Sequence, residues 1–477
     1  MMGQYSVKQK MLQCALPYLT QSLKLVEQAE RSVLILRVNN CSRIVENLCK
    51  QYGEVKHTEI ISSAQRHSQQ MALVEFAEEE HVQDMIRDCV SSGERWCFES
   101  RLSRIMSFQR PRHVDSRQTS TSDRQSTKKK LNAHLRGGTM QLGDCIRAVK
   151  ETTELSDTAL RCHYLQCKLI DDLMSYHMPE VITLPHGSVL SGLATVHSDL
   201  DMVLHPFGLA NYNMHRKVNK PTGKFQASFS SASLGAKADS FDVDMINYVA
   251  FALRYFGKTF CRTVVPLPQA KHPIVRFVSA LGFGNCDLTA HLYKPNEGIL
   301  SSCMLQMICD SFPDFQSLSH CLRFWARERA LTSSQPGKFL INFTLTHLLI
   351  YYLQEMKLLP SIQDLTTPDV KVDSLSTDPD ALGELYKDFF LFYSKFDYDQ
   401  VIDITTGQLL SRTELTFPLE FQDAPMAILN TLDPTRNIAL RMGEEYLQKF
   451  VKYSTDTYHS LSGGKSQLAS FKTSHRI

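Results

Sequence analysis

The sequence predicts an α+β protein with a small β-α-β-β-α-β domain first, a mixed central domain next and a helical half last. Between residues 31 and 98, short runs rich in Val, Ile and Leu alternate with amphipathic helical patterns. Two further strand-like runs, at 198–204 and 285–291, each carry aspartate. From residue 300 onward, apolar residues recur at the three- and four-residue spacing of helices, and we expect a strongly apolar helix to open at Asn342 and Phe343.

Composition is that of a globular protein, and the 477 residues predict about three domains at roughly 150 residues each. The net charge is only +2, so any affinity for nucleic acid must come from local basic patches. The 13 cysteines show no C-x-x-C pair, which predicts free, mostly buried thiols in a reducing compartment. No apolar run reaches about 18 residues, so we expect no membrane span.

The N-terminal region divides into two parts. Residues 1–26 hold three lysines and no acid, and we expect a transit or disordered segment there. Residues 27–105 follow the element order of an RNA-recognition domain, which stacks bases on aromatic side chains of its central strands. Here those strands offer Leu34, Leu36 and Phe76. We therefore expect an RRM-like shape that is poor in RNA chemistry and used for packing or protein contacts.

Three segments have the composition of connections. Residues 106–136 form a basic linker: the stretch 101–136 holds ten Lys or Arg against two acids. A solvated linker is expected, and its charge leaves open a loose grip on RNA phosphates. Residues 206–240 contain a Gly/Ser/Lys-rich insertion that we expect to be mobile, and residues 459–477 are expected to be a disordered tail.

The stretch 185–204 combines a glycine turn with paired acids. In a strand, alternate side chains share a face, so Asp199 and Asp201 should lie side by side. Two carboxylates ~4 Å apart repel by roughly 4 kcal/mol at an effective dielectric near 20. A divalent cation relieves that repulsion. A bare D-x-D is typical of an exposed strand edge, but backbone N–H groups at Gly187 and Ser188 can bind phosphate oxygens. The combination predicts a metal–nucleotide site.

This pattern resembles the signature of the nucleotidyltransferases related to polymerase beta. That superfamily places a third carboxylate on a later strand, and Asp287 follows a turn built on Gly282 and Gly284. Three acids around two Mg²⁺ or Mn²⁺ ions suit in-line phosphoryl transfer. A second D-x-D, Asp242 and Asp244, opens a helical run without a preceding Gly-Ser, so we interpret it as a helix N-terminus.

Three motifs in the helical half make the family resemblance more specific. RFWAR at 323–327, INFTL at 341–345 and LNTLDPTRNI at 429–438 follow the acids in the order seen in template-independent terminal nucleotidyltransferases. Within that group the chain most resembles the mitochondrial poly(A) polymerases, over roughly residues 27–455. The resemblance implies a palm domain at 137–300 and a helical, poly(A)-polymerase-associated domain at 301–458. It also implies a homodimer formed through the N-terminal domain.

The resemblance also assigns roles to single residues. It implies that Gly187 and Ser188 hold the triphosphate, Asp199, Asp201 and Asp287 bind the metals, Arg323 and Arg327 contact the β and γ phosphates, Asn342 contacts the ribose, Phe343 stacks on the base and Asn437 belongs to the base-reading loop. Two departures from the family pattern affect the phosphate-binding turn: Val189 replaces a second serine, and Ala194 replaces a glycine.

The reaction implied is the addition of AMP from ATP to RNA 3′-hydroxyl ends in the mitochondrion. Arg436 stands where uridine-adding relatives often carry histidine, which favours ATP over UTP. Two alternatives stay open at this point. One is a terminal uridylyltransferase that uses UTP, and the other is a catalytically weak scaffold that binds RNA.

Overall fold

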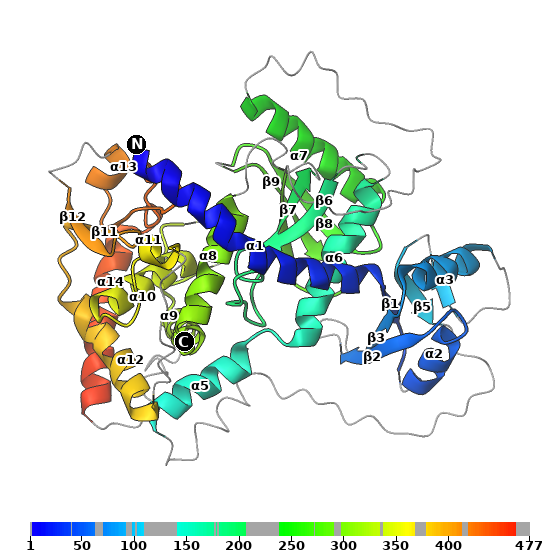
Figure 1. The fold of residues 1–477 in the computed structure, drawn as a ribbon, viewed down its shortest axis with the longest axis horizontal. Helices are drawn as coiled ribbons and strands as arrows, with labels where there is room; N and C mark the ends of the chain where they lie inside the picture. Colours follow the sequence, from blue (N-terminus) through cyan, green and yellow to red (C-terminus); the bar gives the residue numbers. More distant parts are fainter. Residues whose placement is uncertain are drawn as a thin grey trace.

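The structure is a computed structural model that describes residues 2–39, 41–62, 70–91, 98–100, 103–108, 141–175, 178, 181–206, 238–270, 272–290, 297–333, 337–367, 378–412 and 418–463. Most of the predicted linker, of the 206–240 insertion and of the predicted tail lies outside these residues. In Figure 1 a small N-terminal domain, a central sheet domain and a helical domain lie side by side, and helix α1 crosses all three. No described helix is long and apolar enough to span a membrane.

The small domain shows the predicted β-α-β-β-α-β order and adds one strand. Its elements are β1 (Ser32–Leu36), α2 (Ser42–Cys49), β2 (Val55–Ser62), β3 (Gln70–Phe76), α3 (Glu79–Ser91), β4 (Phe98–Ser100) and β5 (Ile105–Phe108). The sheet order is β2-β3-β1-β5-β4. Strand β5 was not predicted; it runs parallel to β1 and extends past the predicted domain boundary at residue 105.

Both faces of this sheet are covered. One face, with Val33 and Phe76, packs under α2 and α3 in the domain's own core. The other face, with Leu34 and Leu73, belongs to the same apolar cluster as the palm helix α6 (Asp157–Met174). Leu34 stands on the strand where an RNA-recognition domain carries a stacking aromatic side chain, and it is buried against protein. Phe76 lies in the domain's own core, so neither side chain can reach a base.

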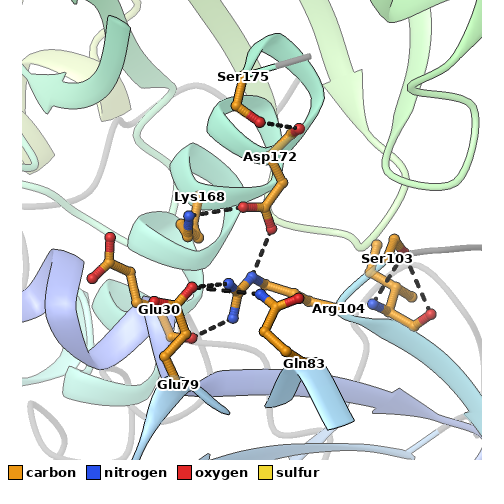
Figure 2. A network of polar contacts seen from close by, with 9 residues as sticks. Glu30, Glu79, Gln83, Ser103, Arg104, Lys168, Asp172 and Ser175 are labelled. Atoms are coloured by element: carbon orange, nitrogen blue, oxygen red, sulfur yellow. Dashed lines mark hydrogen bonds and ion pairs between the residues drawn. The ribbon is translucent and has the colours of Figure 1, made fainter. Parts of the chain in front are cut away.

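A buried arginine joins the small domain to the palm (Figure 2). Arg104, just before β5, has a fully buried side chain. Its Nε donates to Asp172 on α6 at 2.6 Å and its Nη2 to Glu79 on α3 at 3.0 Å. Its Nη1 donates to the carbonyl of Glu30 at the end of α1. Burial alone would raise the pKa of Asp172, but Arg104 and Lys168 together lower it to about 2.

Of residues 1–26, expected to be a transit or disordered segment, all that the structure describes lies in helix α1 (Met2–Glu30), so the expectation of disorder is wrong there. The helix carries a buried stripe at helical spacing: Met11 and Ala15 pack in the core of the helical domain, and Val26 packs with the palm. The hydroxyl of Ser22 hydrogen-bonds the hydroxyl of Tyr164 on α6 at 2.7 Å. The stripe is hard to recognise in sequence because it includes Ala15 and Ser22, while the larger Leu12 and Leu16 lie exposed.

The palm is built on a five-stranded sheet in the order β6-β7-β10-β9-β8. Helices α6 and α7 share an apolar cluster with one face of this sheet. Helix α7 begins at Ala238, so Asp242 and Asp244 lie inside a helix, but not at its N-terminus as predicted, and Asp244 is exposed. The remaining palm elements are α5 (Leu142–Thr153), β6 (Val181–His186), β7 (Leu200–Pro206), α7 (Ala238–Tyr255), β8 (Cys261–Leu267), β9 (Ile274–Ser279) and β10 (Asn285–Ala290).

The helical domain packs around aromatic side chains. Trp325 is fully buried, lies 4.8 Å from Phe390 between ring centroids and donates to Thr457 at 2.9 Å. A small sheet, β12-β11-β13, was not predicted. The elements are α8 (Glu297–Ser311), α9 (Phe315–Glu328), α10 (Asn342–Glu355), α11 (Ile362–Leu365), α12 (Pro379–Ser394), β11 (Gln400–Asp403), β12 (Gln408–Ser411), α13 (Leu419–Gln422), β13 (Ala427–Ile428) and α14 (Glu444–Ser462). Helix α14 includes residues 459–462 of the predicted tail.

The described cysteines are free thiols, as predicted, and all but Cys14 and Cys89 are buried.

Candidate functional site

One row of side chains runs across the palm sheet. The strand register places His186 opposite Asp201, Asp201 opposite Asp287, Asp287 opposite Arg276 and Arg276 opposite Val265. Cross-strand partners project from the same face of a sheet. The sheet therefore brings the acids of β7 and β10 together, beside a cation on β9.

Asp199 lies one residue before β7 and two before Asp201, which places it on the same face as Asp201. Its Oδ1 accepts a hydrogen bond from the amide of Asn285 at 3.2 Å. Burial and the charge of Asp287 raise the pKa of Asp199, against the effect of that hydrogen bond. Burial and then the charges of Asp287 and Asp199 raise the pKa of Asp201 to about 7. The site therefore holds more negative charge than its surroundings stabilise.

Oxygen donors crowded in this way fit Mg²⁺ or Mn²⁺, which prefer carboxylate ligands. No group of three His, Cys, Asp or Glu side chains in the described part of the chain already has the geometry to hold a metal ion. Both oxygens of Asp287 are bonded to arginine: Oδ1 and Oδ2 accept from Nε and Nη2 of Arg276 at 2.8 and 2.6 Å. Asp199 and Asp201 would bind the metal directly, and Asp287 would join when Arg276 yields an oxygen.

The turn after β6 presses against Asp201. Gly187 has a φ of 65°, and a Cβ built there would lie 2.7 Å from Oδ2 of Asp201. Only glycine fits this position, because a side chain would clash with the acid and strain the backbone. The Gly187 N–H donates to Oγ of Ser302 at 2.7 Å, so this amide is already bonded. The carbonyl of Ser188 accepts from the N–H of Leu193 at 3.0 Å, which closes the turn.

The two departures in this turn do not face solvent. Val189 and Ala194 are each only 5% exposed and pack in the palm core. Their side chains therefore serve the core, and Val189 does not take the place of a hydroxyl that faces a bound phosphate.

The two arginines of α9 have different environments. Arg323 donates from Nη1 to the carbonyl of Leu193 at 2.6 Å and from Nη2 to Oγ1 of Thr346 at 3.0 Å. Burial lowers its pKa to about 10, and its Nε has no hydrogen-bond partner among the described residues. Arg323 thus ties the glycine turn to α10, and its contact with phosphate stays a prediction.

Arg327, in contrast, is exposed. Its guanidinium carbon is 5.6 Å from the centroid of the Phe324 ring. Burial and then the charge of Arg327 lower the pKa of His197, two residues before Asp199. Arg327 therefore faces the loop that leads into the acids.

Helix α10 begins at Asn342, as predicted. Asn342 is exposed, and Phe343 is half-buried with its ring centroid 4.3 Å from that of His347. Oγ1 of Thr346 donates to the carbonyl of Asn342 at 2.8 Å and also accepts from Arg323. The start of α10 is thus linked through Arg323 to the glycine turn, while the nucleotide contacts of Asn342 and Phe343 stay predictions.

The side chain of Asn437 is hydrogen-bonded within its own loop. Its Oδ1 accepts from the N–H groups of Ile428 and Ala439 at 3.0 and 2.9 Å. Its Nδ2 donates to the carbonyls of Met426 and Glu420 at 3.0 and 3.3 Å. Two donors and one acceptor oxygen are the whole capacity of a carboxamide, and all are used. In this structure Asn437 shapes the loop from inside, and its amide is not presented to a base.

The neighbouring Arg436 links the loop to the palm. Its Nε lies 2.9 Å from a carboxylate oxygen of Asp433, and its Nη1 is 3.1 Å from Nε2 of His272, on the β8–β9 connection. Glu297 at the start of α8 lies 3.9 Å away. Arg436 is thus held at the junction of the two domains, at the position where the resemblance expects base selection.

Three polar partners of the site were not predicted from sequence: Arg276, Asn285 and Ser302. Two of them carried a signal. The hairpin of β9 and β10 is centred between Leu281 and Gly282, which pairs Arg276 with Asp287, and Asn285 stands two residues before that acid. Ser302 lies on α8, 115 residues from Gly187, and no local pattern marks it.

Fold and acids together define a nucleotidyltransferase palm of the polymerase beta-like class. Residues 142–310 match the family model described as "Poly(A) RNA polymerase, mitochondrial-like, central palm domain". This part of the chain is a palm of that family, and the resemblance stated from sequence is confirmed there.

Comparisons with whole proteins agree. The chain is 26% identical over 465 residues to "Poly(A) RNA polymerase, mitochondrial" of Mus musculus, which covers 90% of this chain and 75% of that protein. The Homo sapiens protein of the same name is 26% identical over 338 residues, 66% of this chain and 55% of that protein. The chain thus spans little more than half of the human relative. A solved structure, "Crystal structure of mtPAP in Apo form", has a TM-score of 0.78 at 19% identity over 95% of this chain and 99% of that one, so the fold is shared.

Proposed function

We propose that the chain is a template-independent RNA 3′-adenylyltransferase that adds AMP from ATP by metal-ion catalysis. The observation that carries the proposal is the meeting of Asp199, Asp201 and Asp287 on adjacent strands, against the glycine turn. The match of the palm to the mitochondrial-like poly(A) RNA polymerases supports it. The acids and the turn account for nucleotidyl transfer, and the relatives account for RNA as the acceptor.

In the proposed reaction the RNA 3′-oxygen forms a bond to the α-phosphorus of ATP, the bond to the β-phosphate oxygen breaks, and pyrophosphate leaves. Mg²⁺ bound at the acids would lower the pKa of the 3′-hydroxyl and offset charge on the phosphates. Asp199 and Asp201 fix the position of that charge because β7 is braced on both sides in the sheet. Arg327 extends positive charge toward the loop before Asp199, where a triphosphate would lie. Positioning and electrostatics then supply most of the rate enhancement.

Separate extension assays with each nucleoside triphosphate determine which one the protein adds to RNA. We expect a labelled RNA primer to be extended at least tenfold more efficiently with ATP than with UTP, because Arg436 replaces the histidine of uridine-adding relatives. The solved relative has been crystallised with UTP, GTP, CTP and ATPγS, so nucleotide binding alone does not discriminate. The measurement is kcat/KM for each nucleotide. A clear preference for UTP would point to a uridylyltransferase, and ATP binding without any product would point to a scaffold.

Partners and location belong to the same proposal. The relatives named mitochondrial support a mitochondrial location, and RNA 3′ ends are the proposed acceptor. A homodimer through the small domain is proposed from the family resemblance. Since one sheet face packs on the palm and the other on α2 and α3, the surfaces that the described residues leave for a second copy are the helices and the edge strands β2 and β4.

A further inference from the structure

The ion pair between Arg276 and Asp287 is the feature of the site that the proposed mechanism does not use. The two residues face each other across the antiparallel strands β9 and β10. The guanidinium makes two parallel hydrogen bonds, which is the strongest geometry for this pair. The carboxylate of Asp287 is 16% exposed, whereas the Arg276 side chain is 46% exposed and free to move outward.

Arg276 lies against the acid cluster. Its guanidinium is bonded to Asp287, which stands opposite Asp201 in the strand register, and Asp199 is two residues before Asp201. Arg276 is thus a cation held directly beside the acids. A divalent ion bound by the same acids would repel it, because like charges at close range inside a protein are unfavourable.

We propose that Arg276 competes with metal ions for Asp287. Its guanidinium pairs with the carboxylate in the metal-free protein, and at least one of its two hydrogen bonds must break when a metal ion binds. This rests on the proposed function to the extent that Asp287 is taken as a metal ligand. Arg276 is thus a positioning residue: it keeps β10 and its acid in place while the site is empty, and it competes with the ion. Because its side chain is partly exposed, the guanidinium can turn toward solvent when it leaves Asp287.

A purely supporting arginine would behave in the opposite way. Groups that hold a metal ligand in place typically raise metal affinity, and their loss costs about 10–100-fold. A competing cation lowers affinity, and its loss should raise it. The sign of the change therefore distinguishes the two roles.

The test is Mn²⁺ binding to the full chain without nucleotide or RNA. Binding is measured from the loss of the electron paramagnetic resonance signal of free Mn²⁺. Arg276→Gln should bind Mn²⁺ about tenfold more tightly or better than the wild type, the scale on which one nearby charge shifts a carboxylate equilibrium. Arg276→Lys keeps the charge and should stay within a few-fold of the wild type. Arg262→Gln, an exposed change of equal charge on β8, should also stay within a few-fold.

Unchanged or weaker binding by Arg276→Gln would overturn the proposal, and so would Arg276→Lys binding as tightly as Arg276→Gln. Thermal unfolding of each variant establishes that it is folded, and Arg276→Met, which also removes the charge, takes the place of the glutamine variant if that one does not fold. The readout is independent of catalysis. If the wild type transfers no nucleotide but the affinities follow this order, the inference stands and the proposed function fails.

Discussion

Replacing Asp201 with asparagine should abolish nucleotide addition and, at the same time, stabilise the metal-free protein. The first effect follows because Asp201 lies opposite Asp287 in the strand register and two residues after Asp199, so its loss removes a proposed metal ligand; we expect the rate to fall by at least about 10³-fold. The second follows from the pKa. Burial and two like charges raise the pKa of Asp201 to about 7, so its ionised form opposes folding at higher pH.

The sign of the pH dependence follows from that shift. A carboxyl group whose pKa is raised in the folded state costs stability above that pKa and costs progressively less as the pH falls from about 7 toward its unfolded value. At pH 8, the free energy of unfolding of Asp201→Asn should therefore exceed that of the wild type by about 1–3 kcal/mol, and the variant should unfold at a higher temperature. The difference should shrink toward pH 5. Differential scanning calorimetry without metal measures it.

Asp244→Asn is the matched control, since it removes an equal charge from the second D-x-D, at an exposed position on α7. We expect neither loss of primer extension nor a gain in unfolding temperature for it. Extension by Asp201→Asn at the wild-type rate would remove the acid row from the mechanism. A loss in Asp244→Asn as large as that in Asp201→Asn would show that the effect is not specific to the row.

Replacing Arg104 with methionine should destabilise the junction between the small domain and the palm by about 3 kcal/mol, the lower end of the range for breaking a buried ion pair. The side chain is fully buried and serves Asp172, Glu79 and the carbonyl of Glu30 together. Methionine fills the volume but leaves that carbonyl without its donor and Asp172 with Lys168 alone as cation. The lower end applies because Asp172 and Glu79 are partly exposed and water can hydrate them.

Hydrogen exchange is the measurement suited to this change, because several domains need not unfold in one step. Amides of β1, β5 and α6 should exchange faster in Arg104→Met, while those of α10 and α12 should not change. Arg87→Met is the control: Arg87 is 71% exposed and pairs with Asp84 on the same helix, so its loss should change stability by less than about 0.5 kcal/mol. Equal exchange in Arg104→Met and Arg87→Met would contradict the role of the network.

Local patterns predicted the elements that carry the chemistry. Strands β7 and β10 were recognisable because each is a short apolar run with its acids on one face, and the left-handed Gly282 and Gly284 mark the turn before β10. The start of α10 at Asn342 was predicted from a long apolar run. In these cases the residues that determine the structure are neighbours in sequence, so the pattern is visible locally.

The other features depend on partners far away in sequence. Helix α1 packs on α6 and on the helical domain. Its buried stripe can be recognised only when these partners are known. Strands β5, β11, β12 and β13 have two to four residues, too few to show an alternation. The inward amide of Asn437 depends on the path of the loop around it. Sequence identifies such a residue but not the direction of its side chain.

The central claim is that acids from two neighbouring strands bind catalytic metal ions beside the glycine turn. Anomalous diffraction from crystals of the full chain grown with Mn²⁺ and a non-hydrolysable ATP analogue tests it most directly. We predict manganese bound by carboxylate oxygens of Asp199, Asp201 and Asp287, with Arg276 moved away from at least one oxygen of Asp287. Crystals with the analogue bound but no manganese at these acids, or with manganese bound elsewhere, would contradict the account.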